Sequence, residues 1–138
     1  MKDSILKITS AKDLKGLKVA IIRGVEHSKV ATANLKDVRQ VNSAIQLFEL
    51  LKRKRAEVVI DTEINGRWIL QQDKYRPFLK NCGVFARFGL YNYINDNRKE
   101  VLHRVSSKIK ELQESGELEQ MVKDSETKAL LLGPENFY

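Results

Sequence analysis

The first residues suited to binding chemistry lie in "IIRGVEHSK", residues 21–29. An apolar, β-branched run ends at Gly24, and a helix is expected to begin within the next few residues. A turn of this kind leaves backbone N–H groups free and faces the positive end of the helix dipole. An ordinary strand-to-helix turn without a ligand is the alternative. The residues that would form an anion-binding loop are Arg23, Gly24, Val25, His27 and Ser28.

A second candidate is "RAEVVIDTE", residues 55–63, in which an apolar strand is followed by three polar residues. The three are Asp61, Thr62 and Glu63. Thr62 is able to hydrogen-bond a solute, whereas a purely structural passage out of the strand is the alternative. Trp68 follows closely, and aromatic side chains often wall solute sites. Packing of Trp68 in the core or on the surface is equally consistent with the sequence.

The basic run "KRKR", residues 52–55, raises the question of nucleic-acid binding. The chain has a net charge of +7 and a pI near 9.5, which suits an anionic polymer or membrane surface. However, the basic residues are scattered along the whole chain, which is typical of a solvated surface. The run also falls at the end of a predicted helix, where cations complement the helix dipole.

Few residue patterns in the chain favour catalysis or metal binding. Cys82 is the one cysteine, so an intrachain disulfide and a CxxC site are excluded. His27 and His103 are far apart and lack partners at metal-ligand spacing. The sequence has no paired carboxylates, P-loop, dinucleotide fingerprint or nucleophile elbow. We therefore expect neither an enzyme nor a cofactor, and metal binding is the less favoured role for the histidines.

The first half of the chain alternates short apolar strands with helices, which predicts crossover connections and a largely parallel sheet. The second half is less regular, with one clear amphipathic helix. The expected elements are strands at 18–24, 37–41 and 56–62, helices from 26–28 onward and after a Ser43–Gln46 capping box, a helix near 67–73, one or two strands at 83–95, a helix at 98–114 ended by Gly116, and a short helix over "ELEQMVKD".

Two long stretches resemble a known family. "DLKGLKVAIIRG" followed by "LFELLKRKRAEVVIDTE" is similar to the second lobe of the extracellular solute-binding proteins of family 3, the periplasmic amino-acid-binding type. "LYNYINDNRKEVLHRVSSKIKELQESGELEQM" resembles that family's C-terminal strand and helices. Together the matches cover roughly residues 13–123. The resemblance implies a type II periplasmic-binding-protein fold, in which two α/β lobes close on a solute by a hinge motion.

The resemblance also implies roles for individual residues. In the family, the loop after the first strand of this lobe has a glycine followed by a hydroxyl residue and cradles the solute carboxylate. Gly24 matches this pattern, but Val25 stands where the hydroxyl residue is usual. Arg55 matches a family arginine, and Glu57 replaces the aspartate that follows it.

The family's acid for the solute's ammonium group aligns with Thr62, which Asp61 and Glu63 flank. A shift of one residue along a strand turns the side chain to the other face, so neither neighbour is a simple substitute. A bulge would restore Asp61, and Thr62 would otherwise face a different kind of solute.

The resemblance leads to a full set of expectations. Residues 1–12 are expected as an N-terminal hinge segment, 13–62 as the second-lobe α/β core, and 63–138 as a return segment with the C-terminal helices of lobe one. The first segment of lobe one is missing, so we expect a truncated or naturally short form, with homodimerisation or segment swapping.

The expected function is non-covalent binding of a small polar solute, amino-acid-like or otherwise anionic, in the periplasm. The protein would serve an ABC transporter or a sensor, with a membrane permease or sensor as partner and nucleic acid as an unlikely one. The alternatives are a nucleic-acid or anionic-polymer binding module and a degenerate lobe that acts as an interaction module.

Overall fold

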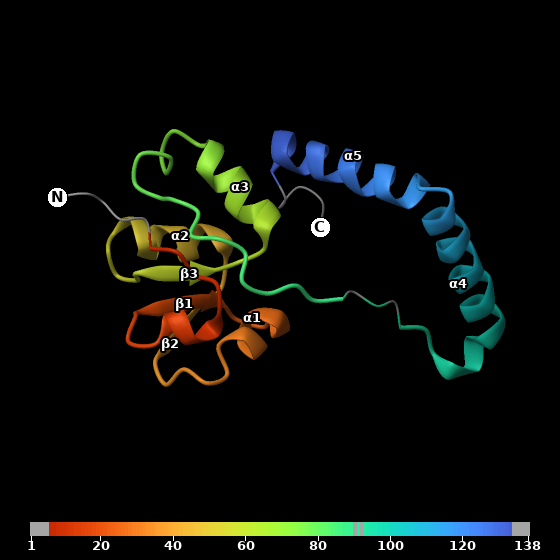
Figure 1. Ribbon diagram of the computed structural model, residues 1–138, viewed down its shortest axis with the longest axis horizontal. Helices are drawn as coiled ribbons and strands as arrows, with labels where there is room; N and C mark the ends of the chain where they lie inside the picture. The colour runs from red at the N-terminus through yellow and green to blue at the C-terminus, as the bar shows by residue number, and fades with distance from the viewer. Residues whose placement is uncertain (1–5, 90, 92, 134–138) are drawn as a thin grey trace. The chain divides into compact units, whose positions relative to one another are not determined.

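The computed structural model describes residues 6–89, 91 and 93–133 of the 138-residue chain. The chain divides into two compact units, Met1–Phe88 and Gly89–Tyr138. The first is an α/β unit and the second consists of helices (Figure 1). The α/β class predicted from the sequence is confirmed, whereas the predicted division into hinge, lobe core and return segment stays a prediction.

A three-stranded parallel sheet forms the centre of the first unit (Figure 1). Its strands are β1 (Val19–Ile22), β2 (Val38–Val41) and β3 (Val58–Ile60), in the order β2-β1-β3. Helices α1 (Glu26–Ala31) and α2 (Ala44–Lys52) connect them. Each strand is short and rich in β-branched residues, which fit the pleated surface of a buried sheet. The predicted strand–helix–strand–helix–strand order is therefore confirmed.

Alternate side chains of β1 point to two separate hydrophobic clusters. Ala20 is fully buried against Leu47 and Leu50 of α2. Val19 and Ile21 face the other side of the sheet, where Leu14, at the end of the 3₁₀ helix η1 (Ala11–Leu14), is also fully buried. The period of two along the strand thus places a helix on one face and the N-terminal segment on the other.

Helix α3 (Glu63–Gln71) starts four residues before the helix that we predicted near 67–73. Thr62 provides the N-cap, since its hydroxyl accepts a hydrogen bond from the N–H of Asn65 at 3.4 Å. The predicted start was wrong because the apolar residues of this helix are concentrated in its second half, "WIL". Ile69 packs with Phe48 in a third hydrophobic cluster, which joins α3 to α2.

Helix α2 has the predicted cap and an unexpected end. The hydroxyl of Ser43 accepts from the N–H of Gln46, whose side-chain oxygen accepts from the N–H of Asn42. At the other end, the N–H of Lys54 donates to the carbonyl of Leu51, and the N–H of Arg55 donates to the carbonyl of Leu50. These are the two hydrogen bonds of a Schellman motif. Lys54 has a φ of 56°, a left-handed conformation that glycine usually supplies.

The basic run at residues 52–55 is divided among different environments. The ammonium of Lys52 lies 5.3 Å from the ring centroid of Phe78. Arg53 forms an ion pair with Glu49 at 3.2 Å. The run therefore ends α2 and precedes β3, as the sequence indicated.

The strands predicted at residues 83–95 are absent from the described part of that segment, 83–89, 91 and 93–95. Aromatic and β-branched residues favour strands only where a sheet edge and a half-buried surface receive them. Just before this segment, the N–H of Ile8 donates to the carbonyl of Cys82 at 3.0 Å. Phe85 packs on the core, whereas Phe88 and Tyr91 are exposed.

The second unit contains a short 3₁₀ helix η2 (Asp96–Arg98) and helices α4 (Lys99–Glu114) and α5 (Glu117–Leu132). Gly116, with a φ of 77°, ends α4 as predicted. Helix α5 has 16 residues and is longer than the predicted short helix, because "SETKALLL" continues it without a glycine or proline.

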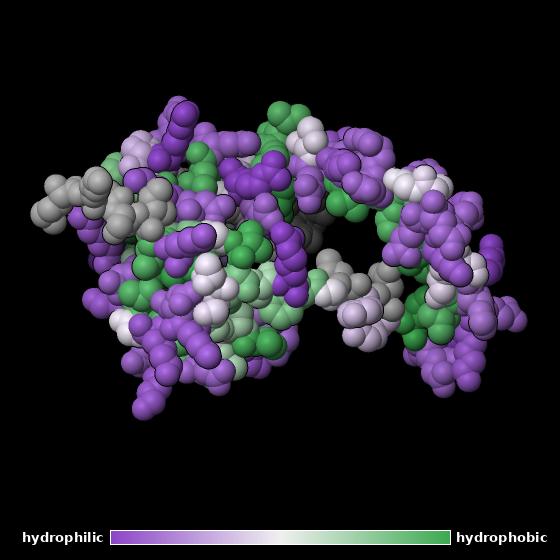
Figure 2. All heavy atoms as spheres, in the orientation of Figure 1, coloured by the Kyte–Doolittle hydropathy of each residue, from purple (hydrophilic) through white to green (hydrophobic). Residues whose placement is uncertain are grey.

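Helices α4 and α5 bury none of their side chains, and hydrophobic ones lie among hydrophilic ones along both (Figure 2). Within the described residues, no helix is long and apolar enough to cross a membrane.

Candidate functional site

The predicted site residues follow the carboxyl ends of two neighbouring strands. β1 pairs with β3 in parallel, with Val19 opposite Val58, so both strands end at the same edge of the sheet. The connections that leave this edge, residues 23–28 and 61–65, are named here the carboxyl edge. In open parallel sheets, ligands bind outside the carboxyl ends of the strands. The fold therefore brings the two candidate stretches of the sequence together.

The loop after β1 is shaped mainly by its backbone. The N–H of Arg23 donates to the carbonyl of Val41 at 2.8 Å and extends the pairing with β2. Gly24 adopts a φ of 81°, which a residue with a side chain rarely tolerates. Val25 is the N-cap of α1 and offers no side-chain oxygen to the helix. The Arg23 side chain is exposed at the rim of the edge.

His27 and Ser28 carry buried polar atoms without a hydrogen-bond partner among the described residues. These atoms are Nε2 of His27 and Oγ of Ser28. Ser28 is 1% exposed, whereas His27 is half-buried with its ring centroid 6.0 Å from that of Phe88. Leaving such an atom unpaired costs free energy. Pairing either atom with a hydrogen-bond partner would therefore be stabilising.

Asp61 is the half-buried acid of the carboxyl edge. Its carboxylate accepts the N–H of Thr62 at 2.8 Å and the side-chain amide of Asn65 at 3.1 and 3.2 Å. Burial raises the pKa of Asp61 above its ordinary value, while these hydrogen bonds and the nearby His27 lower it in part. His27 and Asp61, which the sequence placed in separate candidates, thus interact electrostatically.

The two residues after Asp61 have different surroundings. Thr62 is exposed and its hydroxyl is occupied as the N-cap of α3. Glu63 is exposed in the first turn of the same helix. Trp68 is half-buried and packs on the cluster of Phe48 and Ile69, which is the packing alternative considered for it. Asp61 therefore has defined hydrogen-bond partners at the edge, whereas Glu63 is exposed.

One residue of this edge, Asn65, and one residue beside it, Phe88, were missed by the sequence analysis. Asn65 lies four residues after Asp61, and the N-cap at Thr62 brings its amide back onto that carboxylate. A cap at Thr62, recognised from "DTEIN", would have identified it. Phe88 reaches His27 from a distant part of the chain, and no local pattern signals such a contact.

The carboxyl edge thus combines acceptors, donors and an aromatic wall. The carboxylate of Asp61 suits an ammonium or another donor, and the imidazole of His27 suits a donor or an acceptor according to its protonation. Within the described ranges, no three His, Cys, Asp or Glu residues are grouped to hold a metal ion. The arrangement is suited to hydrogen bonding of a small polar molecule.

An open cavity of about 860 Å³ lies elsewhere, at the opposite edge of the sheet, where β1 and β2 begin. None of the carboxyl-edge residues lines it.

Comparison of the chain with protein-family models, curated proteins and solved structures finds no match. The likeness to family 3 solute-binding proteins accordingly stays a prediction that rests on the quoted motifs.

Proposed function

We propose that this chain binds a small, polar, amino-acid-like solute non-covalently at the carboxyl edge of its sheet. The observation that carries the proposal is the parallel pairing of β1 and β3, which brings His27 and the hydrogen-bonded Asp61 and Asn65 to the same edge from two separate strand-to-helix connections. Nε2 of His27 is buried and has no hydrogen-bond partner among the described residues, and His27 lowers the pKa of Asp61 electrostatically. Such convergent polar groups beside an aromatic ring are typical of solute sites.

The chemistry of the edge suggests how a zwitterionic solute would lie. Its ammonium group would donate to Asp61, whose carboxylate is held in place by Asn65 and the Thr62 N–H. Its carboxylate would face Arg23, the exposed cation beside Gly24. Phe88 would cover an apolar part of the solute next to His27. Opposite charges at the two ends would give orientation as well as affinity.

The proposal extends to a biological role through the sequence resemblance. The chain would act as a periplasmic-binding-protein-like component of an ABC transporter or sensor, with no chemical step of its own. Its partners would be the solute, a membrane permease or sensor, and a second copy of the chain. The parallel sheet with flanking helices is compatible with this finer assignment.

A thermal-shift panel tests the proposal. The purified chain is heated with single amino acids, dicarboxylates and polyamines, and one zwitterionic solute is expected to raise its Tm. A solute at 100 times its Kd stabilises by about 2.7 kcal/mol. Asp61→Asn should abolish the shift, and Glu63→Gln, which removes a neighbouring exposed carboxylate, should leave it intact. Equal shifts in both variants would place binding elsewhere, and no shift with any zwitterion would contradict the proposal.

Anionic-polymer binding is a second candidate, favoured by the exposed cations that line the cavity at the start of β1 and β2. A polymer binder should retard single- or double-stranded DNA or RNA in a gel and lose affinity steeply with salt. A chain that binds neither polymer nor solute would be better explained as an interaction module.

A further inference from the structure

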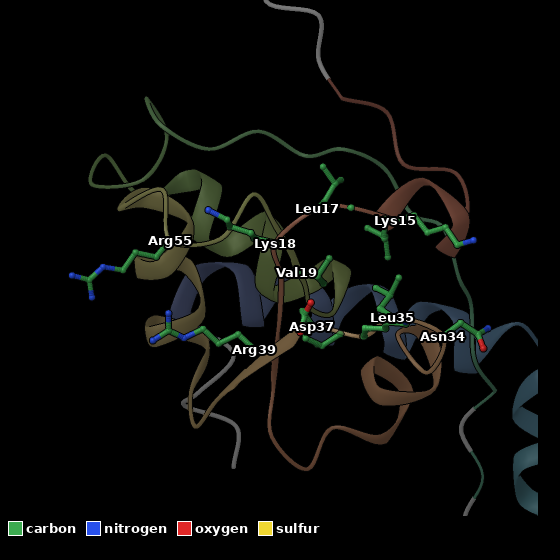
Figure 3. A pocket seen from close by; sticks show the side chains of 13 residues that line it. Lys15, Leu17, Lys18, Val19, Asn34, Leu35, Asp37, Arg39 and Arg55 are labelled. Atoms are coloured by element: carbon green, nitrogen blue, oxygen red, sulfur yellow. The ribbon is translucent and has the colours of Figure 1, made fainter.

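A second polar region lies at the opposite end of the strands. The cavity of about 860 Å³ is bordered by residues of the turn before β1, the start of β2 and the start of β3. We name this region the amino edge. Figure 3 shows Arg55, Arg39 and Lys18 at one end of it and Lys15 at the other. The cationic side chains that line the cavity are Lys15, Lys18, Lys36, Arg39 and Arg55.

The middle of this cavity is apolar. Leu14 and Val19, which line it, are buried members of the core cluster below. Leu17 and Leu35 are half-buried, so part of each remains accessible, and Figure 3 shows Leu35 close to Val19 in the centre. A cationic rim therefore surrounds a surface that favours contact with hydrocarbon.

The five cations of the rim lack the ion pairs that hold many other basic residues of the chain. Lys29 pairs with Glu26 and Arg53 with Glu49. Across the described residues, no ion pair is found for any rim cation. Asp37 also lines the cavity, and Glu57 accepts the backbone N–H of Lys18 at 2.8 Å nearby. Two acids thus stand against five cations, which leaves the amino edge strongly positive.

We propose that the amino edge binds a small organic anion with an apolar body, such as an aryl phosphate. The anionic group would lie between Arg39 and Arg55, where planar guanidinium groups suit phosphate oxygens. The apolar body would cover Leu17 and Leu35. The cavity volume falls within the range of small-molecule sites. This site is separate from the carboxyl edge and does not depend on the function proposed there.

The test uses 1-naphthyl phosphate as the probe and follows backbone amides by NMR during titration of the full chain. The amides of Gly16, Leu17 and Arg39 are expected to shift, whereas those of Gly24 and Asn65 at the carboxyl edge should not. Inorganic phosphate and 1-naphthol each carry half of the recognised chemistry. Both are expected to bind at least about tenfold more weakly than the probe.

Two variants separate charge from apolar contact. Arg39→Gln with Arg55→Gln should weaken binding of the probe about fivefold to tenfold, because two exposed cations next to the phosphate are lost. Lys99→Gln with Lys110→Gln removes the same charge from α4 and should leave affinity unchanged. Leu17→Ser should weaken the naphthyl compound and leave inorganic phosphate unaffected.

Several results would overturn this site. They are equal affinity for inorganic phosphate and the probe, an unchanged affinity in the double arginine variant, or amide shifts confined to the carboxyl edge. In a fourth such result, the chain does not bind the probe but binds an oligonucleotide, and the double arginine variant loses this binding. That result would assign the amino edge to a polymer.

Discussion

At the carboxyl edge of the sheet several polar groups, among them His27, Ser28 and Asp61, are buried or half-buried, whereas at the amino edge they are mostly cationic and exposed. Asp61 accepts hydrogen bonds from its own connection and interacts with His27 of the neighbouring one. Arg39 and Arg55, at the amino edge, have no ion-pair partner among the described residues and stand beside an apolar surface. One sheet thus presents two polar environments of different physical character.

The two edges are therefore suited to different kinds of ligand. Partly buried groups with fixed hydrogen bonds discriminate by geometry, because a misplaced partner leaves them unpaired. Exposed cations attract any anion and depend on ionic strength, so their selectivity must come from the apolar surface that they surround. The carboxyl edge is therefore suited to one specific solute and the amino edge to a class of anions.

The largest expected effect comes from the core beneath the amino edge. Leu14 is fully buried, so Leu14→Ala should lower the free energy of unfolding by about 2–5 kcal/mol. Ile45→Ala, on an exposed position of α2, should cost less than about 1 kcal/mol. Urea denaturation measures both. A loss below 1 kcal/mol at Leu14 would mean that this part of the core is not packed as described.

At the carboxyl edge, removal of a buried side-chain atom should raise the free energy of unfolding instead of lowering it. Ser28→Ala deletes a buried hydroxyl that has no partner among the described residues, and it should stabilise the fold by about 1 kcal/mol. Thr32→Val is the matched control, because that hydroxyl donates to the carbonyl of Ser28 at 2.9 Å. The control should destabilise by about 1 kcal/mol. Destabilisation by Ser28→Ala would show that a bound water or another group satisfies the hydroxyl.

The charge of Asp61 should oppose folding at neutral pH. Its pKa is raised above the ordinary value of 3.8, so the folded chain holds the carboxyl proton more tightly than the unfolded chain. The cost is absent below pH 3.8, grows as the pH rises from there to the raised pKa, and is complete above it. Asp61→Asn should therefore be more stable than the parent at pH 7 and equally stable near pH 3.

Urea midpoints measured across this pH range provide the check. A stability difference that does not change with pH would contradict the raised pKa. The same variant should lose the proposed solute, so that stability and binding move in opposite directions.

The smallest effect concerns the residue that directs the chain toward the amino edge. Lys54 stands in a left-handed conformation that glycine adopts without steric cost. Lys54→Gly should raise the free energy of unfolding by about 0.5 kcal/mol, after the larger backbone entropy of unfolded glycine is included. Calorimetry is the suitable measurement, and a clear loss of stability would argue against the Schellman end of α2.

The sequence predicted the parallel sheet because each strand and helix of the first half has a complete local signal. "VAII", "AEVVI" and the Ser43 cap are examples of such signals. The prediction failed at residues 83–95. Aromatic residues suggested strands there, but the described residues of this segment do not pair with an edge of the sheet. It also failed at the end of α5, where polar "SETK" is followed by "ALLL" without a clear helical period.

The sequence predicted individual residues of the candidate site but not the interactions between them. His27 and Asp61 each follow a recognisable strand, so their common edge follows from parallel pairing. The interaction between them depends on strand order, with β3 next to β1, which the local sequence does not encode. Phe88 arrives by a long-range contact, and the amino-edge cations converge from three separate turns.

The imidazole nitrogens of His27 provide the most direct test of solute binding at the carboxyl edge. The chain has two histidines, His27 and His103, so ¹⁵N-labelled histidine gives spectra that a His103→Gln variant assigns. A zwitterionic solute that raises Tm should shift Nε2 of His27, the buried atom without a partner in the described structure, and leave His103 unchanged. A stabilising solute that leaves the His27 resonances unmoved would contradict binding at this edge.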